Sequence, residues 1–199
     1  MTKKLNIFAQ VRELSGWQAV AFAATLVERM LPNYNLFCEA CDFGDPAQYR
    51  KTLNSIWESL ASPKSKINFA AQLEKIETAI PDAADFDVYG VYPAIDVCMS
   101  MTALILLIMD DDPQGAVVVS KLSQGSVEAF VEAAAAEEID DTQIKQHPLM
   151  QWEISFQADL LGVLASTRPD AGLFKQLKAM ATEEGMSNIG IDMQELSPD

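Results

Sequence analysis

The sequence is poor in basic residues, cysteine and histidine, and each shortage excludes a class of protein. Its 199 residues include 14 Lys and Arg against 29 Asp and Glu, which gives a formal net charge of −15. This charge repels phosphate groups, so it disfavours nucleic acids and anionic membranes as partners, and we expect any protein partner to be basic. Three cysteines, an odd number, argue against a disulfide framework. Since the N-terminus also carries no secretory apolar segment, we expect reduced thiols in a cytoplasmic protein.

Long apolar segments are absent as well, apart from residues 91–109, VYPAIDVCMSMTALILLIM. A membrane-spanning helix needs about 20 consecutive apolar residues, and only thirteen lie between Asp96 and Asp110. A carboxylate such as Asp96 at bilayer depth would also cost about 3 kcal/mol. We therefore predict a central buried helix at about residues 92–109, with the other helices packed around it.

No segment shows sustained alternation of polar and apolar residues, so no strand is predicted. The apolar periodicity instead predicts an all-α bundle of about eight to ten helices. We expect this bundle to form a single domain over residues 1–186, followed by a short acidic tail at 187–199. The other predicted helices cover 5–14, 17–31, 33–41, 46 to about 60, 69–80, 113 to about 138 (one helix, or two broken near 125), 148–163 and a last one from 173 that ends at 185.

Proline and acidic residues mark several of the expected helix boundaries. Pro32 is predicted to break the second helix, because proline lacks the N–H that a helix interior needs. Asp45 and Asp112 are predicted N-caps for helices whose first residues are the prolines that follow them.

Metal and redox sites receive weak support from the sequence. Cys38 and Cys41 form a C-x-x-C pair, but a structural zinc site normally needs four ligands, so all three thiols are expected in the core. His147 precedes a proline and suits a helix cap. The acidic triplet 110–112 lies between two helices, where a cation site stays an open alternative. We predict no cofactor and no defined metal ligand.

The most informative polar residue is Asp96, because it lies in the apolar central helix. A buried carboxylate must be paired or neutralised, and Arg29 is the expected partner in a structural ion pair. The alternative is a ligand pocket near the start of the central helix. Its predicted lining is Asp87, Tyr89, Tyr92 and Asp96, with Glu28 and Arg29 opposite.

Several motifs together resemble the YjaG family of bacterial proteins, a domain-of-unknown-function family. They include WQ at 17–18, ER at 28–29, PNY at 32–34, FGD at 43–45, IWE at 56–58, DFD at 85–87, YGVYPAID at 89–96 and SNIGI at 187–191. The resemblance covers nearly the whole chain. It implies an all-helical cytoplasmic bacterial protein, with a link to signalling suggested by gene neighbourhoods, and it brings no catalytic residues.

These observations favour a non-enzymatic interaction or accessory protein, linked to bacterial signalling. No nucleophile and base are recognisable as a set, which disfavours an enzyme. The alternative is a domain that binds a small molecule or a metal ion in the pocket described above. A hydrolase with paired carboxylates and a mimic of nucleic acid have only the abundance of Asp and Glu behind them. A monomer and a homodimer are both compatible with the sequence.

Overall fold

The computed structural model describes residues 6–192, and within them it confirms the all-α prediction. The described residues form nine α-helices, a short 3-10 helix and no strand. Their only bridge of β type is an isolated antiparallel pair between Met186 and Asp192. The helices are α1 (Ile7–Arg12), α2 (Trp17–Cys41), α3 (Pro46–Ala61), α4 (Phe69–Glu77), η1 (Ala83–Asp85), α5 (Val91–Ile108), α6 (Gly115–Ala134), α7 (Asp141–Gln146), α8 (Pro148–Ser166) and α9 (Ala171–Thr182).

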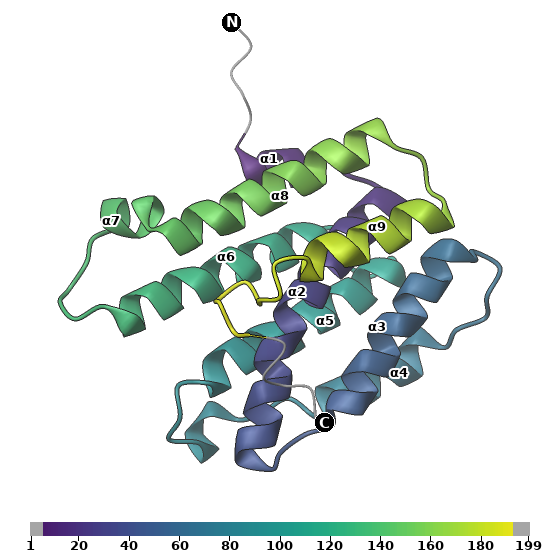
Figure 1. Cartoon of the computed structure of the whole chain (residues 1–199). Helices are drawn as coiled ribbons and strands as arrows, with labels where there is room; N and C mark the ends of the chain where they lie inside the picture. Colours follow the sequence, from purple (N-terminus) through teal and green to yellow (C-terminus); the bar gives the residue numbers. More distant parts are fainter. Residues whose placement is uncertain (1–5, 193–199) are drawn as a thin grey trace, which may run out of the picture.

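Helices α2 and α5 form the centre of the bundle (Figure 1). Helix α2 packs against α3, α5, α6 and α9, and α5 packs against α4 and α6. The pair α6 and α8 lies on one side of this centre, and the pair α3 and α4 lies on the other. The segment after α9 returns toward α2, which brings the end of the described chain to the middle of the molecule.

Helix α5 is the predicted central helix, and it begins at Val91, one residue before the expected start. Within residues 6–192, it alone is long and apolar enough to cross a membrane, and 56 % of it is buried inside the protein. One of its faces reaches the surface, where Tyr92 and Met99 are 55 % and 45 % exposed. The helix is therefore buried on most sides and open on one.

Helix α2 corrects the prediction that Pro32 ends the second helix. The helix continues through Pro32 to Cys41, so the two short helices expected at 17–31 and 33–41 are one helix of 25 residues. A proline in a helix interior costs about 3 kcal/mol. Burial offsets this cost, because Met30, Leu31, Tyr34 and Phe37 are buried on both sides of the proline. The continuous helix carries residues 33–41 along the start of α5.

Helix α6 begins later and ends earlier than predicted. Its first residue is Gly115, and Asp112 instead closes the preceding turn by accepting a hydrogen bond from the Gln114 N–H at 2.8 Å. A Cβ at Gly115 would lie 2.5 Å from the Ala103 carbonyl oxygen, so the glycine allows α5 and α6 to approach closely. The helix runs unbroken past Gly125 and ends at Ala134.

Two further segments differ from their predicted conformation. Residues 141–146, expected as a polar loop, form α7, whose N-cap Asp140 makes a capping box with Gln143. Residues 187–192, expected as the start of the tail, pack into the domain, and Ser187, Asn188 and Ile189 are buried. The rest of the predicted tail, 193–199, lies outside the described residues, as does the start of the predicted first helix at Leu5.

Candidate functional site

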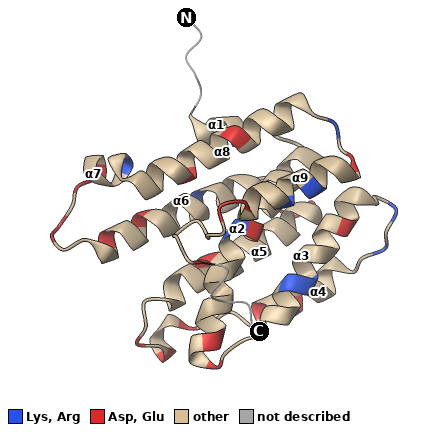
Figure 2. Ribbon diagram, viewed as in Figure 1, with Lys and Arg blue, Asp and Glu red and all other residues tan. Residues whose placement is uncertain are grey.

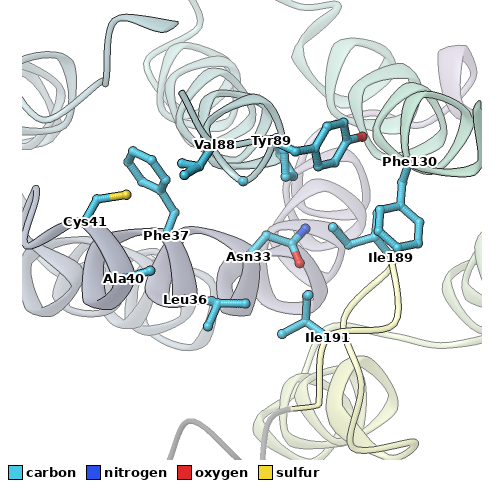
Figure 3. A pocket seen from close by; sticks show the side chains of 12 residues that line it. Asn33, Leu36, Phe37, Ala40, Cys41, Val88, Tyr89, Phe130, Ile189 and Ile191 are labelled. Atoms are coloured by element: carbon cyan, nitrogen blue, oxygen red, sulfur yellow. The ribbon is translucent and has the colours of Figure 1, made fainter. Parts of the chain in front are cut away.

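An apolar pocket lies beside the start of α5, the region where the sequence predicted one. Its volume is about 330 Å³. Three segments and one side chain from α6 enclose it (Figure 3). They are the second half of α2 (Asn33, Leu36, Phe37, Ala40, Cys41), the start of α5 and the turn before it (Val88, Tyr89, Gly90, Pro93), the C-terminal segment (Ile189, Ile191) and Phe130.

Aromatic packing holds one wall of the pocket in place. The Phe37 ring makes edge-to-face contacts with Phe43 and Phe86, at centroid distances of 5.7 and 4.9 Å. Phe43 and Phe86 also touch each other, at 5.3 Å. These three rings join the end of α2 to the segment that precedes α5, and such pairs add about 0.5–1.5 kcal/mol each beyond their buried area.

One of the predicted site residues, Tyr89, lines this pocket, and two others, Tyr92 and Asp96, lie near Tyr89 without lining it. Tyr89 forms part of its wall, and its ring lies 5.9 Å from the Tyr92 ring and 6.2 Å from the Phe130 ring. Burial raises the pKa of Tyr89, and the negative charges of Asp96 and Glu132 raise it further. Asp96 therefore lies close to the tyrosines. Asp87 is exposed and does not line the pocket.

Asp96 is half-buried and is not paired with Arg29, which corrects the predicted ion pair. Burial raises its pKa to about 6, and the hydroxyl of Ser126 on α6 offsets part of this rise. The carboxyl therefore faces α6 and lies near Tyr89.

Glu28 and Arg29 do not lie opposite the tyrosines, which corrects the predicted pocket lining. Glu28 faces α3, where it accepts a hydrogen bond from the Trp57 Nε1–H at 3.0 Å and pairs with Arg50 at 2.5 Å. Arg29 faces α8. Consecutive residues of an α-helix point about 100° apart, so one helix face cannot present both to the same pocket.

The partner of Arg29 is Glu153, at an Nε–Oε2 distance of 3.2 Å, and both side chains are buried. The guanidinium also lies 3.7 Å from the centre of the Trp152 ring and 4.4 Å from that of Phe156. Burial lowers the pKa of Arg29, and the charge of Glu153 partly restores it. A charge enclosed in this way needs both the carboxylate and the aromatic faces.

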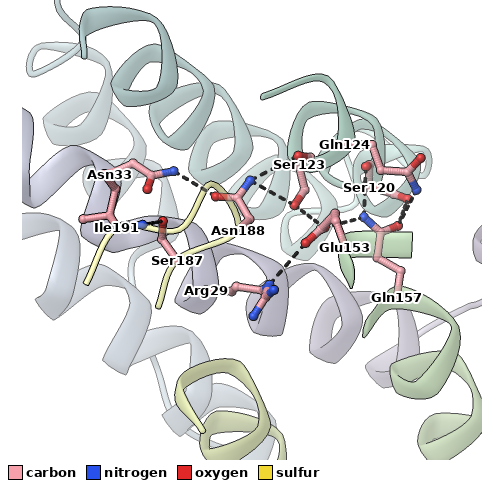
Figure 4. A network of polar contacts seen from close by, with 10 residues as sticks. All are labelled: Arg29, Asn33, Ser120, Ser123, Gln124, Glu153, Gln157, Ser187, Asn188 and Ile191. Atoms are coloured by element: carbon pink, nitrogen blue, oxygen red, sulfur yellow. Dashed lines mark hydrogen bonds and ion pairs between the residues drawn. The ribbon is translucent and has the colours of Figure 1, made fainter. Parts of the chain in front are cut away.

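A buried polar network extends from this ion pair (Figure 4). The second oxygen of Glu153 accepts hydrogen bonds from the Ser123 hydroxyl at 2.5 Å and from the Gln157 amide at 2.8 Å. Ser120 donates in turn to the Gln157 carbonyl oxygen, at 2.6 Å. The network ties α2, α6 and α8 together through side chains that are all buried.

The network reaches the pocket through two asparagines. The Asn188 amide donates to the Ser123 carbonyl oxygen at 3.1 Å, and the Asn33 amide donates to the Asn188 carboxamide oxygen at 2.9 Å. Asn33 is 3 % exposed and forms part of the pocket wall. Within residues 6–192, its carboxamide oxygen has no hydrogen-bond partner.

The sequence-based prediction does not include this network, although the sequence carries one signal of it. Glu153 and Gln157 are spaced with Leu160 and Leu164 at intervals of three and four, so they continue the buried face of α8. The more conspicuous apolar side chains, Trp152 and Phe156, each stand one position earlier and mark a neighbouring face. Polar residues on a buried helix face signal a network, because buried polar groups need partners.

The cysteines, His147 and the acidic triplet 110–112 show no sign of a metal or redox site. Burial raises the pKa of Cys38 to about 11 and that of Cys98 to about 12, so both are held as thiols. His147 caps α8, where its Nδ1 accepts from the Leu149 N–H at 3.2 Å, in line with the predicted cap role. Within residues 6–192, no group of three or more His, Cys, Asp or Glu side chains is placed to hold a metal ion, and this includes the triplet 110–112.

Comparisons with known proteins match almost the whole chain. A family model described as "Protein of unknown function (DUF416)" matches residues 6–192. The uncharacterized protein YjaG of Escherichia coli is 42 % identical over 191 residues, which cover 95 % of this chain and 97 % of that protein. An uncharacterized protein of Haemophilus influenzae is 34 % identical over 192 residues, which cover 95 % and 98 %. The crystal structure of a DUF416 family protein from Shewanella baltica is similar, with a TM-score of 0.88 and 37 % identity, over 95 % of this chain and all of that one.

Proposed function

This chain belongs to the DUF416 family of proteins of unknown function, which confirms the resemblance to the YjaG family. Since the family brings no known activity, we propose a function from the pocket. We propose that the chain is a non-enzymatic protein that binds a small, largely apolar molecule. The observation that carries the proposal is the pocket beside the start of α5. A volume of about 330 Å³ lies within the range of small-molecule sites, which are usually apolar with a few placed polar groups. Asn33 and Tyr89 supply such groups here.

Charge favours a neutral or cationic ligand. Among the described residues, no Lys or Arg lines the pocket. The segments that contain the wall residues also lack Lys and Arg over the ranges 30–49, 76–120, 122–144 and 179–199. Asp96 and Glu132 both lie close enough to Tyr89 to raise its pKa. Acidic residues are spread widely over the helices and loops, whereas basic ones are few (Figure 2). An anion would therefore be repelled by the field around the pocket.

The experiment is a thermal-shift screen of the full chain against small neutral, cationic and anionic apolar molecules. A ligand that binds only the folded state raises the melting temperature, by several degrees when its concentration is far above Kd. The variant Ala40→Phe places a ring in the pocket from an exposed position, so it should abolish the shift. Ala61→Phe, at an exposed position on α3, is the matched control and should keep it. A flat screen, or a shift that survives Ala40→Phe, contradicts the proposal.

A second candidate is a protein-interaction role, with a basic partner. It rests on four large apolar side chains exposed around the pocket: Leu36, Val88, Tyr89 and Tyr92, which are 37 %, 47 %, 37 % and 55 % exposed. Exposed apolar groups gathered in one place favour an interaction site. Capture of a basic partner that is lost in Val88→Asp and kept in Met99→Asp, further along α5, would favour this role. The three free cysteines support a cytoplasmic location for either function.

A further inference from the structure

We infer that the pocket selects ligands that donate a hydrogen bond, because the buried network presents a fixed, unpartnered acceptor at its wall: the Asn33 carboxamide oxygen. The inference rests on the proposed function and names the class of ligand, an apolar molecule that carries an N–H or O–H group. The direction of each hydrogen bond between the ion pair and the pocket fixes the orientation of this oxygen.

The series of hydrogen bonds begins at Glu153. A carboxylate beside a guanidinium accepts hydrogen bonds and donates none, so the Ser123 hydroxyl must give its proton to Glu153. The Ser123 oxygen is then left as an acceptor toward Asn188. The Ser123 backbone carbonyl, also an acceptor, lies 3.1 Å from the same Asn188 nitrogen.

Two acceptors on Ser123 fix the orientation of the Asn188 side chain. Its NH₂ group must face Ser123, because the opposite orientation would bring two carbonyl oxygens together. The Asn188 carboxamide oxygen therefore faces Asn33, and only the Asn33 NH₂ group can donate to it, at 2.9 Å. Each side chain sets the orientation of the next (Figure 4).

The Asn33 oxygen is the end of this chain of hydrogen bonds. It is turned toward Ile191 at the pocket (Figure 3), and no partner for it exists among residues 6–192. Buried oxygens without a partner are rare and destabilising, since the oxygen has lost its water and gained nothing in return. The oxygen itself is buried, so a ligand reaches it by displacing a pocket side chain such as the partly exposed Ile191, toward which the oxygen is turned. A donor group that reaches this oxygen gains a hydrogen bond that an apolar or acceptor group cannot make.

The test is a titration of the full chain with a matched pair of probes, indole and benzofuran, followed by NMR of the ¹⁵N-labelled protein. The two molecules have nearly the same shape, and indole alone has an N–H donor. Indole should bind about tenfold more tightly than benzofuran, and at saturation it should shift the Asn33 side-chain NH₂ resonances further, because only indole adds a hydrogen bond to the ring current that both probes supply. Comparison of the two probes on the unchanged protein needs no variant to fold.

Variants then test whether Asn33 accepts the hydrogen bond of the ligand. Asn33→Leu should bring the Kd ratio of the two probes close to one. Asn35→Leu is the matched control, because the Asn35 oxygen also lacks a partner among residues 6–192 but Asn35 lies outside this pocket. It should leave the ratio unchanged. Equal affinity for both probes on the unchanged chain overturns the inference and leaves the proposed function standing. Binding of neither probe overturns both.

Discussion

Arg29 and Glu153 are 124 positions apart in the sequence and form a buried ion pair, with exposed fractions of 1 % and 0 % for their side chains. The pair joins α2, one of the two helices at the centre of the bundle, to α8. Through Ser123 and Asn188 it also determines the orientation of Asn33 at the pocket. A contact that stabilises the bundle is thus connected to the group that we expect to contact a ligand.

The ion pair predicts a large loss of stability when one partner is removed. Glu153→Gln should lower the free energy of unfolding by about 3–5 kcal/mol, because it leaves the Arg29 charge buried and unpaired. The double variant Arg29→Met with Glu153→Met should recover most of this loss. Denaturant unfolding measures both. Arg50→Met is the control, since that arginine is 43 % exposed and should cost at most about 1 kcal/mol. Equal costs for Glu153→Gln and Arg50→Met would contradict the prediction.

Asp96 predicts a pH-dependent difference in stability. Its pKa in the folded protein, about 6, lies above its ordinary value of 3.8, so folding favours the protonated form. The contribution of Asp96 is therefore most favourable below about pH 4 and is lost as the pH rises through 6. Asp96→Asn should stabilise the chain by about 1–2 kcal/mol at pH 7.5, after allowance for solvent screening, and by little at pH 4. Unfolding of both proteins across this range measures the difference, and a gain that does not vary with pH would speak against it.

Position 44 has no room for a side chain, a requirement that the sequence does not show. Its φ is +73°, and a Cβ there would overlap the buried Tyr34 hydroxyl. Gly44→Ala should lower the free energy of unfolding by about 2 kcal/mol or more. Gly190→Ala is the matched control: φ there is +83°, with no atom near enough to meet the Cβ, so only backbone strain of about 1 kcal/mol is expected. Similar losses at both sites would refute the overlap with Tyr34.

The acidic surroundings of the pocket predict selection by charge. The cation of 2-phenylethylamine should bind more tightly than the anion phenylacetate, although the two have similar rings and lengths. Since the effect is electrostatic, added salt should reduce it. Titration at low and high ionic strength measures the ratio of the two Kd values. Tighter binding of the anion would show that the nearby carboxylates do not govern the site.

The C-terminal segment predicts that a chain ending at 186 is unstable. Such a chain lacks the buried Asn188 and Ile189, and it leaves Asn33 and Ser123 without their partner. We expect a loss of about 3 kcal/mol or more from these contacts. A chain ending at 192 keeps all of them and is the control. Thermal unfolding of the two compares them directly, and equal stability would contradict this expectation and favour the domain boundary at 186 that the sequence predicts.

The approximate place of the pocket could be predicted from the sequence, but its full lining could not. Tyr89 and Tyr92 immediately precede or begin the most apolar segment, where rings that carry hydroxyl groups suit the mouth of a pocket. The sequence predicts Glu28 and Arg29 together on the opposite side of this pocket. The structure separates them, because a helix turns through about 100° between consecutive residues and each faces a different neighbour.

The sequence by itself determined the helical class, the central helix and most helix boundaries, because these follow from local periodicity, caps and turns. The tertiary structure decided the rest. Pro32 lies within a helix because the burial of its neighbours outweighs the lost backbone hydrogen bond. Arg29 pairs with Glu153, and Asn33 with Asn188, because packing brings together residues more than 120 positions apart. Such contacts depend on how whole helices pack, which no local pattern in the sequence encodes.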